Sequence, residues 1–256
     1  MISGSANLVI ITVHSGPIIF LKKTLQSIDA QILAPHHNIV VASRTSLYRT
    51  KFLRKNNRTF VINKDKSIYN AMNIGLRDKV IKNNYIIFLN SGDIFFNKRS
   101  IFNIKKYLLL KKFIIGSQIL HIDSDYYKIR EYFFVKKNYS PHGSFLCHSS
   151  LLNLSKKENF FNEKHSIDAD GLWMTRIINN NKKKLIKISQ NISIHSLGGI
   201  STSPSIKTIS HYFKINLILF FKEFLKFILK ILLSENFYFR VIYMIKYKIQ
   251  KKYRHD

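Results

Sequence analysis

The sequence predicts an α/β fold in which a mostly parallel sheet is covered by helices on both faces. Short apolar runs rich in β-branched residues indicate buried strands, and the segments between them repeat apolar residues at helical spacing. Strands and helices of this length that alternate along the chain are typical of parallel strands joined by covering helices. With 46% hydrophobic residues in a chain of 256, a sizeable core is expected, which excludes a wholly disordered protein.

The elements of the first part follow one another in a regular order. The run 8–13 is a strand that is ended by Ser15, Gly16 and Pro17, and residues 18–30 form a helix with one apolar face. Further strands are expected at 37–42, 60–62 and 85–89, and further helices at 47–55 and 68–82. Ligands of such sheets bind beyond the carboxyl ends of the strands, so the loops after these strands are where we expect a site.

Beyond residue 93 the pattern loosens and indicates an α+β arrangement. Helices are expected at 100–110 and 168–178, a strand at 113–120 and an irregular stretch at 126–135. Ser, Thr and Pro cluster at 201–205 and mark the clearest boundary. We therefore expect one domain over residues 1–205 and a different segment over residues 206–256.

The segment after this boundary is rich in apolar residues and lysine. Its polar residues recur at about every fourth position within 215–233, as Lys222, Glu223, Lys226 and Lys230. This spacing predicts an amphipathic surface helix, because lysines at mid-bilayer would each cost roughly 2.5 to 3.5 kcal/mol in a spanning helix. A basic end favours acidic lipid. A helical cap that packs on the domain is the alternative.

Composition limits the partners and the compartment. The 42 Lys and Arg against 14 Asp and Glu give a formal net charge of +28, which favours polyanions such as nucleic acid, acidic lipid or a phosphorylated substrate. An AT-biased coding sequence would account for part of this charge. The single cysteine, Cys147, excludes a disulfide framework and a zinc site of several thiolates. Residues 1–6 carry no cationic leader, so we expect a cytoplasmic protein.

One acid stands where such a sheet places its ligands. Asp93 ends the segment N-S-G-D, directly after the strand expected at 85–89. A tight turn there would direct its carboxylate to the carboxyl edge of the sheet, where it could hold a divalent cation that bridges two phosphates. Taken alone, Asp93 is better explained as a cap of the next segment.

Several segments together resemble the bacterial family 2 glycosyltransferases, which adopt the A-type nucleotide-sugar fold and build O-antigen, capsule or colanic acid. The resemblance covers residues 8–201. Its motifs read I-T-V at 11–13, K-T-L-Q-S-I at 23–28, D-K-S-I-Y-N-A-M-N-I-G at 65–75, F-L-N-S-G-D at 88–93, P-H-G-S-F at 141–145, D-A-D-G-L-W at 168–173 and L-G-G-I-S at 197–201.

The resemblance implies a role for each matched residue. Asp93 would bind Mn²⁺ or Mg²⁺, with His195 as a further ligand, and Asp170 would be the general base, with Asp168 as the other candidate. His142 and Trp173 would lie on the acceptor side. The residues expected to bind the nucleotide sugar are Thr12, Val13, Arg44, Asp65, Tyr69, Asn73, Asn90, Ser91 and Gly92.

The sequence also departs from the family at three places. The second strand ends V-A-S-R-T-S at 41–46, without the acid that contacts the base of the nucleotide, and Arg44 could grip a phosphate instead. The D-x-D element keeps only its last acid, Asp93. Gly143 replaces the Gln of P-H-Q.

The resemblance implies an inverting glycosyltransferase of bacterial surface polysaccharide synthesis. It would move a sugar from a nucleotide diphosphate to a lipid-linked acceptor at the cytoplasmic face of the inner membrane, where the basic tail would bind peripherally. A catalytically degenerate scaffold of the same fold is the alternative. A nucleic-acid-binding protein is less favoured, because no known nucleic-acid-binding motif is visible.

Overall fold

The computed structural model describes residues 6–43, 55–63, 67–122, 125–129, 141–164, 169–181, 184–196, 209, 217–234, 237–238 and 252–253. The helix expected at 47–55 lies outside the described residues except for its last position. Three residues of the expected site, Arg44, Asp65 and Asp168, also lie outside them, as does the L-G-G-I-S segment.

The first part of the chain forms the parallel half of one sheet. Its strands are β1 (Ala6–His14), β2 (Pro35–Ser43), β3 (Arg58–Asn63) and β4 (Tyr85–Phe88). They lie in the order β3-β2-β1-β4, and each neighbouring pair is parallel. All four expected strands and their parallel arrangement are confirmed, so the carboxyl ends of β1 and β4 lie side by side.

The second half of the sheet is mixed. Next to β4 in the sheet lies β8, which is antiparallel to it. β8 pairs with β6 on its other side, and β6 also pairs with both β7 and β9. These strands are β5 (Ile94–Phe95), β6 (Phe113–Ile122), β7 (Asp125–Ile129), β8 (Phe145–His148) and β9 (Leu185–Ser196). The expectation of an irregular stretch from residue 126 is wrong for β7, because residues 125–129 pair with β6 as a hairpin.

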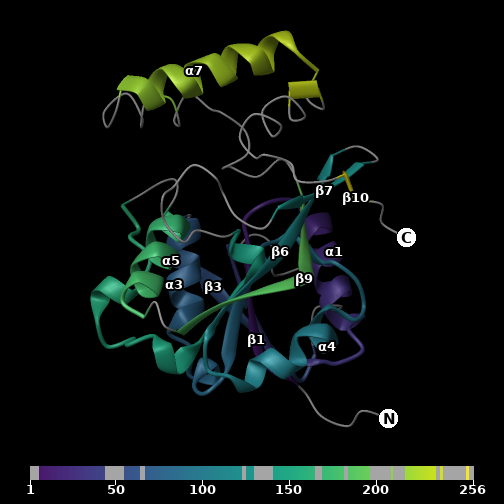
Figure 1. Cartoon of the computed structure of the whole chain (residues 1–256), viewed down its shortest axis with the longest axis vertical. Helices are drawn as coiled ribbons and strands as arrows, with labels where there is room; N and C mark the ends of the chain where they lie inside the picture. Colours follow the sequence, from purple (N-terminus) through teal and green to yellow (C-terminus); the bar gives the residue numbers. More distant parts are fainter. Residues whose placement is uncertain are drawn as a thin grey trace.

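Helices cover both faces of the sheet, as predicted. Helices α1 (Ile18–Asp29) and α4 (Ser100–Ile104) pack on one face, and α3 (Ile68–Leu76) and α5 (Ala169–Asn179) pack on the other (Figure 1). Successive side chains of β1 point to opposite faces of the sheet, so the strand contributes to two hydrophobic cores, one on each face. Leu8 and Ile10 lie with α1 and α4, whereas Val9, Ile11 and Val13 lie with α3 and α5.

Two expected helices end earlier than their apolar spacing suggests. The helix expected at 68–82 ends at Leu76, and Asp78 caps a separate 3-10 turn by accepting a hydrogen bond from the N–H of Val80. The helix expected at 100–110 ends at Ile104 and continues as a 3-10 helix, Lys105–Leu109. Local capping therefore outweighs the periodic pattern at Asp78.

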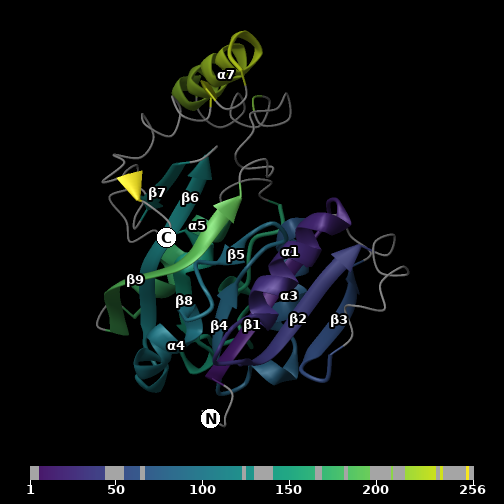
Figure 2. The same ribbon diagram turned by 90° about the vertical axis from the view of Figure 1, so that its right-hand side faces the viewer.

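In the described part of the tail, helix α7 (Leu217–Leu232) lies beyond the end of the sheet at which β6 and β9 finish (Figures 1 and 2). Part of its apolar surface is open to solvent. The exposed fractions are 59% for Phe221, 42% for Phe224, 57% for Leu225, 69% for Ile231 and 72% for Leu232. Within the described residues, no helix has the length and apolar character needed to cross a bilayer. The basic chain end returns to the domain, because β10 (Lys252–Tyr253) pairs with β7.

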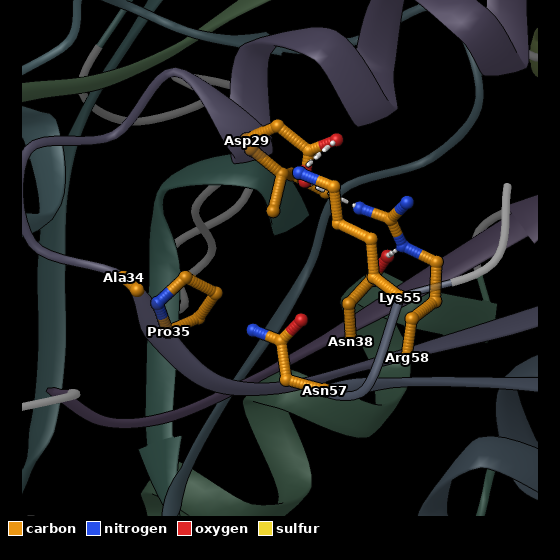
Figure 3. Close-up of a pocket in the computed structure, with 8 residues that line it drawn as sticks. Asp29, Ala34, Pro35, Asn38, Lys55, Asn57 and Arg58 are labelled. Atoms are coloured by element: carbon orange, nitrogen blue, oxygen red, sulfur yellow. Dashed lines mark hydrogen bonds and ion pairs between the residues drawn. The ribbon is translucent and has the colours of Figure 1, made fainter. Parts of the chain in front are cut away.

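A small polar pocket lies at the opposite, amino-terminal ends of β2 and β3 (Figure 3). Arg58 is buried there and donates to Asp29 Oδ1 at 2.7 Å and to Asn38 Oδ1 at 3.1 Å. Lys55 adds an ion pair with Asp29 at 3.0 Å. These contacts join α1 to β2 and β3, so we assign this pocket a structural role.

Candidate active site

The site is built around the turn that follows β4. The N–H of Ser91 donates to the carbonyl of Val13 at 3.0 Å, which holds the turn against the end of β1. Gly92 has φ of 104°, a left-handed conformation that glycine adopts without strain. Thr24 of α1 accepts from the N–H of Gly92 at 2.9 Å and donates to the carbonyl of Asp93 at 2.7 Å. Both β1 and α1 therefore fix the position of Asp93.

Asp93 and His195 meet because β5 and β9 are antiparallel neighbours. The register pairs Ile94 with Ile194, which places positions 93 and 195 opposite each other. His195 Nδ1 lies 2.8 Å from Asp93 Oδ1, and Asp93 is only 3% exposed. Burial would raise the pKa of Asp93, but His195 and His142 outweigh it and hold this pKa well below its ordinary value. The buried carboxyl is therefore ionised.

His142 lies between Asp93 and the expected base. Its Nδ1 is 3.3 Å from Asp170 Oδ2, and its Nε2 is 3.7 Å from Asp93 Oδ2 and 3.1 Å from the side-chain amide of Asn90. Burial would lower the pKa of His142, but hydrogen bonds and charges from Asp170 and Asp93 raise it to about 10. An imidazolium thus separates two carboxylates from distant parts of the chain.

Asp170 stands in the first turn of α5, where the helix dipole favours an anion. Its side chain is 19% exposed, so it is open to a small reactant. Burial would raise the pKa of Asp170, but His142 and the backbone N–H groups of Gly171 and Asp170 hold it below its ordinary value. Asp170 is therefore an ionised, accessible carboxylate that could accept a proton.

The structure gives other predicted site residues structural roles. Thr12 is fully buried and its hydroxyl accepts from Asn38 at 3.1 Å, and Val13 lies in the core. Trp173, which was expected on the acceptor side, is 2% exposed and donates to the carbonyl of Asn159 at 2.8 Å. Thr12, Val13 and Trp173 therefore support the site from inside.

The two predicted residues on α3 also face the protein. Asn73 is 1% exposed, donates to Glu163 Oε1 at 2.7 Å and forms a pair of hydrogen bonds with the backbone of Phe161. The hydroxyl of Tyr69 lies next to α5. These hydrogen bonds give Asn73 a role in holding the segment around residue 161, and its expected contact with a nucleotide sugar stays a prediction. Asn90, Ser91 and Gly92 do lie in the turn at the site, as expected.

The sequence analysis did not identify two residues of the site, His14 and Thr24. His14 ends β1, is 2% exposed, and places Nδ1 2.9 Å from Ser91 Oγ. Burial lowers the pKa of His14, so the ring is neutral. Thr24 was quoted only as part of K-T-L-Q-S-I. Its position on the buried face of an amphipathic helix, with Leu21, Leu25 and Ile28, was the available signal.

The glycine at position 143 is explained by its neighbours. A Cβ at Gly143 would collide with Gln118 Nε2 and Ser193 Oγ. Ser193 donates to the carbonyl of Gly143 at 2.6 Å and accepts from Gln118 at 3.0 Å. A side chain from β6 thus fills the space beside His142 that a larger residue at 143 would need.

Asp93 and His195 offer the chemistry that a divalent cation needs. A carboxylate oxygen and an imidazole nitrogen, 2.8 Å apart, are suitable ligands for Mn²⁺. Among the residues that the structure describes, no group of three or more His, Cys, Asp or Glu side chains has the arrangement of a complete metal site. Asp93 and His195 therefore supply two donors of the kind that such a cation takes.

The chain was compared with known proteins. No protein-family model matches it, and no curated protein sequence matches it. Solved structures do match. S. aureus TarS residues 1–349 in complex with UDP-GlcNAc superimposes with a TM-score of 0.62 at 14% identity, over 83% of this chain and 65% of that one. The fold is that of the A-type glycosyltransferases.

Two further structures share the A-type glycosyltransferase fold. Mannosyltransferase PcManGT from Pyrobaculum calidifontis, in complex with GDP-Man and Mn²⁺, gives a TM-score of 0.57 at 11% identity over 78% of this chain and 59% of that one. GalNAc-T7 with UDP, GalNAc and Mn²⁺ gives 0.50 at 10% identity over 83% of this chain and 48% of that one. The chain thus spans about half to two thirds of these A-type proteins, and the likeness concerns the fold.

Proposed function

We propose that the protein is a glycosyltransferase that moves a sugar from a nucleoside diphosphate donor to an acceptor hydroxyl, with inversion at the anomeric carbon. The observation that carries the proposal is the pair of ionised carboxylates, Asp93 and Asp170, on either side of His142 at the carboxyl edge of the sheet. Similar folds bind UDP-GlcNAc and GDP-Man, which supports a nucleotide sugar as the donor.

Each acid has its own task in this reaction. Asp170 takes the proton of the acceptor hydroxyl while the acceptor oxygen bonds to the anomeric carbon. The bond from that carbon to the diphosphate breaks, and its electron pair leaves with the nucleoside diphosphate. A divalent cation, Mn²⁺ or Mg²⁺, held by Asp93 with His195, would neutralise charge on the leaving diphosphate. The cation bound in the complexes of PcManGT and GalNAc-T7 supports this choice.

For the acceptor, the proposal is a lipid-linked saccharide in bacterial surface polysaccharide synthesis, of the O-antigen or capsule type. Residues 1–205 would be the catalytic domain, and residues 206–256 would bind the cytoplasmic face of the inner membrane. The support is the exposed apolar side of α7 together with the net charge of +28, which complements acidic lipid.

Nucleotide release by the purified full-length protein tests the reaction. UDP-, GDP- and dTDP-sugars are offered in turn with Mn²⁺ or Mg²⁺ and a membrane lipid extract. We expect release from one donor, stimulated by the extract and lost with EDTA. If no donor gave nucleotide release and calorimetry showed no donor binding, the proposed activity would be rejected and a scaffold of the same fold favoured.

Membrane binding has a separate test in sedimentation with vesicles of phosphatidylcholine and phosphatidylglycerol. We expect the triple variant Phe221→Ser, Phe224→Ser, Leu225→Ser to lose about tenfold or more in partition, because each apolar side chain contributes up to about 1.5–3 kcal/mol when buried. Leu109→Ser with Leu110→Ser is the matched control, since these residues are 75% and 46% exposed but lie on the 3-10 helix after α4 and at its end. If the unaltered protein stays in the supernatant, the membrane proposal is rejected and the reaction is not.

A further inference from the structure

Tyr69 connects α3 to the helix that carries the proposed base. It stands in the first turn of α3 and is 7% exposed. Its hydroxyl oxygen accepts a hydrogen bond from the N–H of Ala169 at 3.2 Å and lies 3.5 Å from Asp170 Oδ1. The N–H groups at the start of a helix have no partner within that helix. Tyr69 therefore supplies a partner to the start of α5 and at the same time directs its own hydroxyl hydrogen toward Asp170.

The Tyr69 ring has little freedom to move. It stacks on Phe161, with ring centres 6.0 Å apart and planes at 20°. Phe161 stacks in turn on Trp173 of α5 at 4.6 Å. One helical turn beyond Tyr69, the side-chain amide of Asn73 donates to the carbonyl of Phe161 at 3.0 Å and accepts from the N–H of Phe161 at 2.8 Å. The face of α3 that carries Tyr69 and Asn73 is thus packed against the segment that supports α5.

We propose that Tyr69 is a positioning residue for Asp170, an inference that rests on the proposed role of Asp170 as the base. His142 approaches Oδ2 of Asp170 at 3.3 Å and Tyr69 approaches Oδ1 at 3.5 Å. The carboxylate is therefore contacted on both of its oxygens, each by a side chain from a different part of the chain. A base must hold such a geometry, because a displacement of about 1 Å costs about 10²-fold in rate.

Tyr69→Phe removes the hydroxyl and keeps the ring. We expect kcat for the donor identified by the release panel to fall about 10- to 100-fold, with KM and the calorimetric Kd for that donor changed by less than about twofold. In the Asp170→Asn background the same substitution should have no further effect on kcat, because the two residues act through one carboxylate.

Tyr85→Phe is the matched control. Tyr85 is fully buried, accepts from the N–H of Lys112 at 2.9 Å and donates to the carbonyl of Tyr107 at 3.3 Å. The control therefore loses a similar pair of hydrogen bonds from a buried phenol on β4. We expect a similar decrease in the free energy of unfolding, with kcat unchanged.

Backbone amide exchange gives a measurement that needs no substrate. The Ala169 amide should exchange at least about tenfold faster in Tyr69→Phe, and the Lys112 amide should do so in Tyr85→Phe. Unchanged kcat, or an unchanged Ala169 amide, in a Tyr69→Phe protein whose activity still depends on Asp170 would overturn the positioning role alone. Full activity of Asp170→Asn would instead overturn the proposed base.

Discussion

Asp93→Asn is expected to reduce metal-stimulated nucleotide release by about 10³-fold. The substitution keeps the size of the side chain but removes the charge that lies beside His195 and His142. Loss of a carboxylate that holds a cation at a leaving diphosphate removes several kcal/mol of transition-state stabilisation, and about 4 kcal/mol corresponds to this factor. Calorimetry with the donor should show that Mn²⁺ no longer strengthens binding, as in the unaltered protein with EDTA.

The control for Asp93 is an acid at the other end of the sheet. Asp29→Asn weakens the ion pairs with Lys55 and Arg58, so it should lower the free energy of unfolding but leave kcat and the response to Mn²⁺ unchanged. Donor binding by Asp93→Asn that still strengthens with Mn²⁺ would contradict the assignment of Asp93.

Asp170→Asn is expected to lower kcat by about 10²- to 10⁴-fold, the usual contribution of a general base. Donor affinity should stay within about twofold, since Asp170 faces the acceptor hydroxyl in the proposed reaction. Single-turnover nucleotide release and donor titration measure the two quantities separately. This pattern differs from that of Asp93→Asn, in which binding with Mn²⁺ changes as well.

Glu158→Gln serves as the control for Asp170. Glu158 has a side chain that is 62% exposed and pairs only loosely with Lys156 at 3.9 Å, so kcat should not change. If Asp170→Asn turned over at the rate of this control, the general base would have to be sought outside Asp170, with Asp168 the first candidate.

Much of the fold could be predicted because the decisive signals are local. β4 is an unbroken apolar run and β1 is apolar at 8–11 and 13. A helix lies between β1 and β2 and another between β3 and β4, an order typical of parallel connections. β9 was not expected, although much of its twelve-residue run alternates apolar and polar side chains, a pattern typical of a half-buried strand. β7 depends on its pairing with β6, a property of the hairpin rather than of residues 125–129.

The site shows the same division between local and distant signals. Asp93 and Asp170 were found through matched motifs, each within a short segment. The 2.8 Å contact of His195 with Asp93 depends on the register of β5 and β9, which no local pattern encodes. Tyr69 was placed on the correct helix, but its partner lies a hundred positions away at Ala169. The matched motifs therefore located the acids and named His195 beside Asp93, but the contacts of Asp170 with Tyr69 and His142 were left open.

Gln118 occupies the space beside Gly143, so the residues that fit at these two positions depend on each other. Any side chain at 143 would displace Gln118 and disturb its hydrogen bond to Ser193. A larger residue at 143 would therefore fit best beside a shorter side chain at 118. A larger residue at 143 alone would crowd the site, and a smaller residue at 118 alone would leave a gap there. Positions 118 and 143 should therefore be inherited as a pair, and variation at one should follow variation at the other.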